Sequence, residues 1–348
     1  MRTGARLRLD PATDRIVGMK EGSLVSHILR QVKPRGTKGI FYCLIITLMK
    51  TLFSGPFLIF IAAILWGLDG ILRRTLFDLP PITIVFFEHL IGLIIISPFL
   101  FRAWRGERLS KHEWGAIGIV ALLSGVLGTL FFTAALLKVN FIQFSVVFLL
   151  QKLQPIFAIL AAWLLLKERI TKHYFVWAAL ALVAGYFVTF PNGIVNFAEG
   201  GAYVTAALYA VLAAAAWGAS TAFSRYVLLN HSHTFVTGLR FLLTVPIALL
   251  LVFALGAAPT LAEITTAQFG TLALIAVSTG MVALWIYYRG LKHTRASIST
   301  IVELAFPLTA IFIDYFLYGT VLALSQYAAV IVLMFAMYRV ALLNRENF

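Results

Sequence analysis

Residues 81–101 read PITIVFFEHLIGLIIISPFLF, and Glu88 is the only Asp, Glu, Lys or Arg among them. About 20 apolar residues in helical form are enough to cross the hydrocarbon core of a bilayer. In lipid, every backbone N–H and C=O group has to be bonded within the protein, so such a run forms a helix. The stretch therefore predicts a transmembrane helix.

The rest of the chain repeats this composition. Its 348 residues are 61% hydrophobic and 12% charged, with a mean hydropathy of +0.93, whereas soluble domains are about one quarter charged. We predict an all-α integral membrane protein with ten spans, at 57–77, 81–101, 115–137, 139–166, 174–190, 201–223, 235–255, 267–288, 297–318 and 321–338.

The positive charges indicate how the spans are oriented. Although the net charge is +14, the Lys and Arg residues lie in connectors and in the N-terminal tail, which argues against nucleic acid as a partner. With the N-terminus inside, the inner connectors and C-terminal tail hold thirteen Lys and Arg residues and the outer connectors hold three. Positive residues favour the cytoplasmic side. We expect a multi-pass protein of the cell (inner or plasma) membrane with both termini cytoplasmic.

The N-terminal segment differs from the spans. Residues 1–38 carry nine Lys and Arg residues against three Asp and Glu, without the apolar run of a signal peptide. The segment is either a cytoplasmic tail or the product of a mis-assigned start, since Met49-Lys50 resembles a natural N-terminus. With only one cysteine, Cys43, no intramolecular disulfide forms. We divide the chain into a basic extension and two repeats, at 1–55, 56–193 and 194–343.

The two halves of the membrane region share a repeated pattern. Three matched pairs are offset by 151, 154 and 152 residues: Trp66-Gly67 with Trp217-Gly218, Leu137-Lys138 with Leu291-Lys292, and Pro155 with Pro307. Each half holds five spans, an odd number, so the second half must be inverted relative to the first. Inverted repeats are typical of secondary transporters, with the substrate site between the halves. Pro155 and Pro307 predict helix bends at that site.

Several short motifs resemble the EamA family of the drug/metabolite transporter superfamily, over residues 57 to 340. They are Leu65-Trp66-Gly67, Ala216-Trp217-Gly218, Gly238-Leu239-Arg240-Phe241, Tyr287-Tyr288-Arg289-Gly290-Leu291-Lys292, Gln154-Pro155 and Leu166-Lys167-Glu168-Arg169-Ile170-Thr171. The resemblance implies a ten-helix exporter of amino acids or other small metabolites. Two positions depart from the pattern: His89 stands near where the second half has Arg240, and Gly319-Thr320 replaces the Glu168 motif.

The fourth span contains the main candidate for substrate binding. Lys152 lies near its middle, between Gln151 and Gln154, too deep to reach the headgroups. An ionisable group at this depth marks a functional site by default, so Lys152, Gln151 and Gln154 are candidate substrate contacts. The alternative is an ion pair of Lys152 with Glu88 or Asp69.

Three carboxylates are candidates for proton coupling. Glu303 lies four residues before Pro307, at the depth of Gln151 in the other repeat, and could also bind substrate; its alternative is an ion pair with Arg240. Asp69 precedes Arg73 by four residues, which favours a local helix pair. Glu88 either joins the site or reaches the headgroups.

Three further side chains in the predicted spans each allow two interpretations. For Arg240 we favour a long side chain that reaches the headgroups. Trp66 and Trp217 either line the substrate site or pack between helices.

The recurrence of Ala206, Ala210, Ala214 and Gly218 in the sixth span predicts close helix packing. The first span is the suggested neighbour.

Other functions find less support. The chain has no P-loop and no zinc-protease or hydrolase motif, so we expect neither an enzyme nor a cofactor. His231 and His233 are a weak metal signal, and a solvated loop is the favoured interpretation. The preferred function is alternating-access export or exchange of a small polar metabolite. A membrane scaffold or sensor, or a membrane-embedded enzyme, is the alternative. The partners expected are the substrate and lipid; a homodimer stays open.

Overall fold

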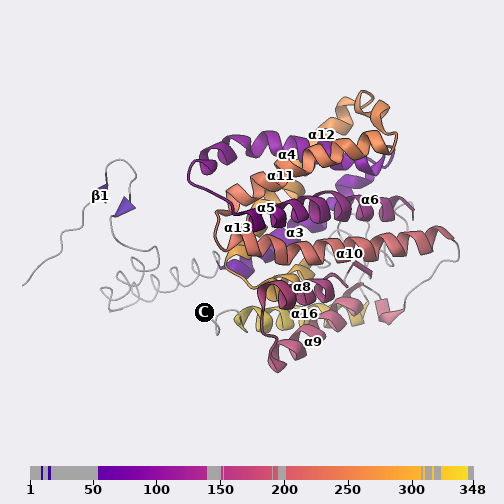
Figure 1. Ribbon diagram of the computed structural model, residues 1–348. Helices are drawn as coiled ribbons and strands as arrows, with labels where there is room; N and C mark the ends of the chain where they lie inside the picture. Colours follow the sequence, from indigo (N-terminus) through magenta and orange to yellow (C-terminus); the bar gives the residue numbers. More distant parts are fainter. Residues whose placement is uncertain are drawn as a thin grey trace, which may run out of the picture. The chain divides into compact units, whose positions relative to one another are not determined.

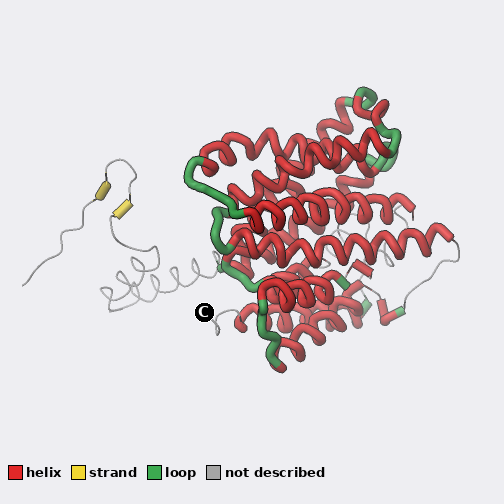
Figure 2. The backbone as a smooth tube through the Cα atoms, in the orientation of Figure 1, coloured by secondary structure: helices red, strands yellow, loops and turns green. Residues whose placement is uncertain are grey.

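The computed structural model describes residues 9–10, 15–16, 54–138, 150–151, 153–189, 191–194, 201–306, 309, 316 and 323–343. The chain divides into two units, Met1–Phe53 and Ser54–Phe348. In the first unit, strands β1 (Leu9–Asp10) and β2 (Arg15–Ile16) pair antiparallel. In the described part of the second unit, helices joined by loops and turns make up the structure (Figure 2).

The first repeat contains helices at each of its predicted spans. They are α3 (Gly55–Arg74), α4 (Pro81–Trp104), α5 (Lys111–Val120) continued by the π-helix η1 (Ala121–Gly128) and α6 (Thr129–Lys138), then α8 (Gln154–Leu166) and α9 (Lys172–Thr189), followed by the short 3-10 turn η2 (Pro191–Gly193). Proline at the first turn suits the starts of α3, α4 and α8, because a first-turn N–H has no partner within the helix.

The second repeat follows the same plan. It comprises α10 (Gly201–Leu228), α11 (His233–Ala254), the 3-10 turn η3 (Ala258–Leu261), α12 (Thr266–Ile275) continued by the π-helix η4 (Ala276–Gly280) and α13 (Met281–Lys292), then α14 (Ala296–Val302) with the 3-10 turn η5 (Glu303–Ala305), and α16 (Leu324–Leu343). The third span of each repeat is therefore interrupted by a π-helix. Such interruptions are frequent at functional sites.

The helix neighbours show the relationship between the repeats. Helix α3 packs on α13 as α10 packs on α6, and α8 packs on α10 as α14 packs on α3. The pairs α4–α11 and α9–α16 lie toward opposite sides of the bundle (Figure 1). Exchanging the two repeats thus returns the same set of contacts, as a pseudo-twofold relationship requires. The small-residue stripe of α10 lies against α6 and α8, so the suggestion that it faces the first span was wrong.

The outer surface of the helices is apolar. Within the described part of the chain, seven helices are long and apolar enough to cross a membrane, and three shorter apolar helices fall at the remaining predicted spans: Gln154–Leu166, Lys172–Val188 and Ala296–Ala305. Large apolar side chains such as Phe101, Phe175, Leu250 and Ile331 are more than two-thirds exposed. Exposed apolar surface of this extent suits contact with lipid. The chain is a multi-pass membrane protein.

Candidate functional site

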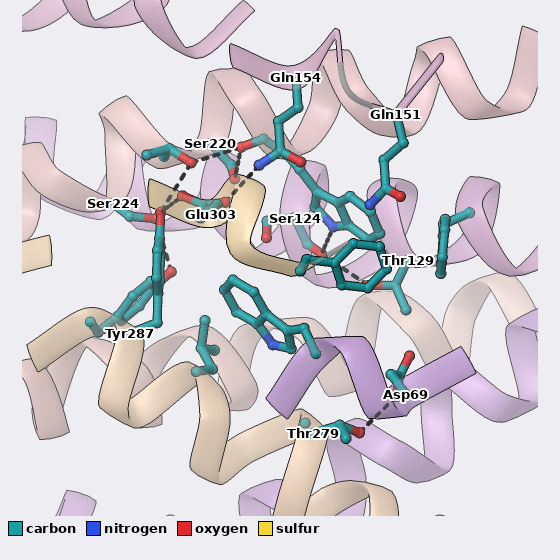
Figure 3. Close-up of a pocket in the computed structure, with 18 of the residues that line it drawn as sticks. Asp69, Ser124, Thr129, Gln151, Gln154, Ser220, Ser224, Thr279, Tyr287 and Glu303 are labelled. Atoms are coloured by element: carbon teal, nitrogen blue, oxygen red, sulfur yellow. Dashed lines mark hydrogen bonds between the residues drawn. The ribbon is translucent and has the colours of Figure 1, made fainter. Parts of the chain in front are cut away.

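A cavity lies at the centre of the helical unit, lined by α3, α4, η1, α6, α8, α10, α11, η4, α13, α14 and η5 (Figure 3). Besides charged side chains, its lining has two uncharged chemical components. The first is aromatic: Trp66, Phe132, Trp217, Phe241, Tyr287, Tyr288 and Phe306. The second is polar and uncharged: Ser124, Thr129, Gln151, Gln154, Ser220, Thr221, Ser224, Thr279 and Thr300. A few polar groups set among apolar walls are typical of a small-molecule site.

Glu303 connects the two repeats inside this cavity. Its Oε1 accepts hydrogen bonds from Tyr287 Oη at 2.7 Å and from Ser299 Oγ at 3.0 Å. Its Oε2 accepts one from Gln154 Nε2, at 2.9 Å, across from the first repeat (Figure 3). Gln154 Nε2 can only donate, and the hydroxyl groups of Tyr287 and Ser299 can each donate to the carboxyl group or bond to each other. The ion pair with Arg240 that we considered for Glu303 is not formed.

A cluster of fixed charges lies elsewhere on the cavity wall. Arg73 donates through Nε to Asp69 and through Nη2 to Glu88 at 2.7 Å. Asp69 also accepts a hydrogen bond from Thr279 Oγ1, in the second repeat, at 2.7 Å. The local pair expected for Asp69 is therefore present, and Glu88 completes it from the neighbouring helix. Two carboxyl groups, one on the same helix and one on α4, therefore share one guanidinium.

The two π-helices place backbone and side-chain polar groups at the cavity. The carbonyl oxygen of Ser124, in η1, accepts hydrogen bonds from Thr129 Oγ1 at 3.2 Å and from Trp217 Nε1 at 3.3 Å. In η4, Thr279 is the donor to Asp69. A π-helix shifts the regular backbone hydrogen-bonding pattern. Trp217, from the other repeat, binds the Ser124 carbonyl group of η1, and Asp69, from the other repeat, binds the Thr279 hydroxyl group of η4.

Arg240 is the third buried arginine of the described residues, beside Arg73 and Arg225, and is 8% exposed. Its Nη1 lies 3.4 Å from Tyr288 Oη, and its guanidinium carbon lies 5.9 Å from the centre of the Tyr288 ring. Its Nε–H is buried, and none of the described residues accepts a hydrogen bond from it. The expectation that Arg240 reaches the headgroups was wrong, because its face of α11 is turned toward the cavity and not toward lipid.

The structure brings most of the predicted site residues together. Trp66, Trp217, Gln151, Gln154, Glu303, Asp69, Glu88 and Pro155 all line the cavity. Lys152 and Pro307 lie outside the described residues. Glu88 and Asp69, the proposed alternative partners of Lys152, both bind Arg73. The roles assigned to these residues stay predictions.

Sequence reasoning missed the hydroxyl groups and the tyrosines. Tyr288 Oη lies 2.8 Å from Ser224 Oγ, and Trp66 packs on Tyr287 with ring centroids 5.0 Å apart. Serine and threonine are common in membrane helices, so their positions alone carry no signal. The tyrosine pair was part of a recognised motif, and that motif could have pointed to the site.

Outside the cavity, two polar clusters join connectors of the two repeats. Glu168 accepts hydrogen bonds from the N–H groups of Ala296 at 2.8 Å and Ser297 at 3.1 Å, capping α14, and pairs with Arg225 at 3.4 Å. A carboxylate is favourable at a helix N-terminus. Lys167, in the left-handed conformation, ends α8 directly before it.

The second cluster surrounds His231. Its Nδ1 lies 2.7 Å from Glu107 and its Nε2 lies 3.1 Å from Glu113. His231 is buried, so the interpretation of this segment as a solvated loop was wrong for His231. Burial raises the pKa of Glu107, but hydrogen bonds from His231 and from Ser232 outweigh it and leave that pKa below its usual value. Among the described residues, no group of three or more potential metal ligands forms a metal site.

Comparison with known proteins identifies the family. The profile of the EamA-like transporter family matches the chain twice, at residues 53–190 and 204–342. The chain belongs to the EamA-like transporter family. It is thus a transporter of small molecules built from two EamA repeats.

Two individual similarities extend this result. The riboflavin transporter ImpX of Fusobacterium nucleatum subsp. nucleatum is 37% identical over 306 residues, which cover 84% of this chain and 98% of that protein. The chain is also similar to a solved crystal structure of a protein, with a TM-score of 0.65 and 17% sequence identity. The similarity covers 84% of this chain and 97% of the other. At that identity the second similarity shows the fold alone.

Proposed function

We propose that this protein transports riboflavin, or a flavin closely related to it, through the central cavity. The observation that carries the proposal is the 37% identity to a riboflavin transporter along nearly the whole length of that protein. The proposal narrows the small polar metabolite expected from the sequence to one chemical class.

The cavity lining supports this substrate class. Riboflavin consists of a flat, three-ring aromatic system and a chain of hydroxyl groups. Aromatic side chains such as Trp66, Trp217 and Tyr287 offer ring faces, and offset or tilted aromatic packing stabilises such contacts. Hydroxyl and amide groups such as Ser124, Gln151 and Gln154 can both donate and accept hydrogen bonds, as a polyhydroxyl chain requires. Lys152, beside these glutamines, is proposed as a further contact.

Transport would proceed by alternating access, with the repeats exchanging their packing around the cavity. We assign residues 1–55 to a cytoplasmic extension, residues 56–193 and 194–343 to the two repeats, and the protein to the cell membrane with both termini inside. The Glu168 and His231 clusters then lie on the cytoplasmic side, and both join one repeat to the other. Opening toward the cytoplasm would break these contacts.

Glu303 is the proposed proton site. It accepts a bond from each repeat, so protonation would replace an acceptor by a donor at the contact between the repeats. A proton and a flavin could in this way favour different packings of the same helices. The gradients of the two would set the direction of transport.

Ligand-dependent stabilisation of the purified protein tests the proposed substrate. A ligand that binds only the folded state raises its stability by about 2.7 kcal/mol at a concentration 100 times its Kd. Riboflavin should raise the Tm in a concentration-dependent manner, while amino acids, sugars and organic cations should not. A well-folded sample that riboflavin leaves unchanged, and that another class stabilises, would overturn the flavin assignment.

A further inference from the structure

The three buried arginines differ in what balances their charge. Arg73 binds Asp69 and Glu88, and Arg225 binds Glu168. Arg240 has no carboxylate within 4.0 Å among the described residues, and its Nε–H has no partner. A buried charge without a counter-ion is unfavourable unless something else binds it.

The second repeat has no counterpart of the Asp69–Arg73 pair. The matched pair Trp66 and Trp217 places Asp69 and Arg73 in register with Ser220 and Ser224. The first repeat therefore presents charges from its opening span, whereas the second presents hydroxyl groups at the same positions. Ser224 instead lies 2.8 Å from Tyr288 Oη, which is the hydrogen-bond partner of Arg240.

From this asymmetry, and resting on the proposed flavin substrate, we infer that Arg240 is a substrate-binding residue that donates hydrogen bonds to the carbonyl-bearing edge of the flavin ring. Arg240 lines the cavity, as do Tyr288 and Phe241. A guanidinium carries five N–H donors and no acceptor, so it selects a group with several acceptors. The pyrimidine end of the flavin ring system carries two carbonyl oxygens and an acceptor ring nitrogen.

The neutral polar groups of the cavity indicate where the other end of the substrate would bind. The hydroxyl-rich chain of riboflavin faces the glutamine and serine groups of the cavity, where Gln154 and Ser220 offer neutral partners. Arg240 on one side, and Gln154 and Ser220 on the other, would thus bind opposite ends of one molecule.

Flavin fluorescence titration of the purified full-length protein tests the role of Arg240. The probes are riboflavin, lumiflavin (the same ring system without the hydroxyl chain) and flavin mononucleotide. Arg240→Met should weaken binding of riboflavin and lumiflavin by the same factor, about 10-fold or more, because hydrogen bonds to charged groups are the strong ones. Arg240→Lys, which keeps the charge but loses the planar fork, should bind less tightly than wild type. The exposed Arg102→Met is the matched control.

The thermal stability of the ligand-free variant adds an independent readout. Removal of an unbalanced buried charge should leave the Tm of Arg240→Met unchanged or raise it, while flavin binding weakens. A structural role of Arg240 would lower the Tm instead.

Riboflavin affinity of Arg240→Met within twofold of wild type would overturn the inference. Loss of riboflavin binding with lumiflavin unaffected would move the contact to the hydroxyl chain and overturn the ring-edge assignment. A preference of wild type for flavin mononucleotide that Arg240→Met abolishes would assign Arg240 to phosphate. Failure of wild type to bind any flavin would overturn the proposed function, and this inference with it.

Discussion

Arg73 on α3 donates a 2.7 Å hydrogen bond to Glu88 on α4, while its Nε binds Asp69 one turn earlier on its own helix. The side chain of Arg73 is 4% exposed, so the pair is shielded from water. A local helix pair has thereby become a tertiary contact between the first two spans of the repeat, on the wall of the cavity.

Arg73→Met should destabilise the protein by about 3–5 kcal/mol, because it leaves the buried Glu88 and the partly buried Asp69 without a counter-ion. Thermal unfolding in detergent measures the change, with Arg102→Met as the exposed control. Adding Glu88→Gln to Arg73→Met should recover part of the loss. Equal Tm values for Arg73→Met and Arg102→Met would show that the cluster contributes nothing to stability.

Glu303→Gln should abolish the response of riboflavin flux to an imposed pH gradient while exchange of riboflavin for riboflavin continues. The amide resembles a permanently protonated carboxyl group, so it can no longer release a proton. Flux into proteoliposomes at several internal and external pH values measures the response, with the exposed Glu263→Gln as control. A pH response in Glu303→Gln equal to that of wild type would exclude Glu303 as the coupling site.

Gly218→Ala should destabilise the packing of α10 on α8 by about 1–3 kcal/mol, as overpacking in a tight interface does. A Cβ at Gly218 would lie 2.7 Å from the backbone oxygen of Gln154 and 2.9 Å from the backbone nitrogen of Ala158, and neither can move independently of α8. Gly270→Ala, on a helix where a Cβ meets nothing within 4 Å, is the matched control and should be neutral or stabilising. A Gly218→Ala protein as stable as Gly270→Ala would contradict the close approach.

Glu107 should contribute to the pH dependence of stability. Its folded-state pKa is lowered by His231 and Ser232 against the opposing effect of burial. A lowered folded pKa gives stability that is present above the unfolded-state value, about 4.5, and is lost as the pH falls through the folded value. Below about pH 5, the Tm of Glu107→Gln should fall less steeply than that of wild type. Parallel Tm curves for wild type and Glu107→Gln, with Glu263→Gln as reference, would contradict this role.

The sequence predicts the helical framework well because its signals are local or periodic. Apolar runs mark the spans, and the pairs Trp66–Trp217 and Gly67–Gly218 mark the repeat. Asp69 and Arg73 are four residues apart, so their pair could be predicted from one helix. The contact of Glu88 with the same arginine depends on how α3 and α4 are arranged in space, so the sequence did not predict it.

The orientation of Arg240 could not be predicted from the sequence. The sequence shows how deep Arg240 lies along its span, but depth does not determine which face of a helix packs against a neighbouring helix. The same limit applies to His231, whose short polar segment resembles a solvated loop until Glu107 and Glu113 are brought to it by the other repeat. The hydroxyl groups of the cavity were equally hidden, since isolated serines occur throughout membrane helices.

Riboflavin counterflow tests the central claim most directly. Proteoliposomes loaded with unlabelled riboflavin are diluted into a trace of labelled riboflavin, and internal label is followed against protein-free liposomes. A riboflavin transporter should accumulate label transiently above the external concentration, and excess external unlabelled riboflavin should abolish the effect. Folded, reconstituted protein that accumulates no more label than empty liposomes would contradict riboflavin transport by this chain.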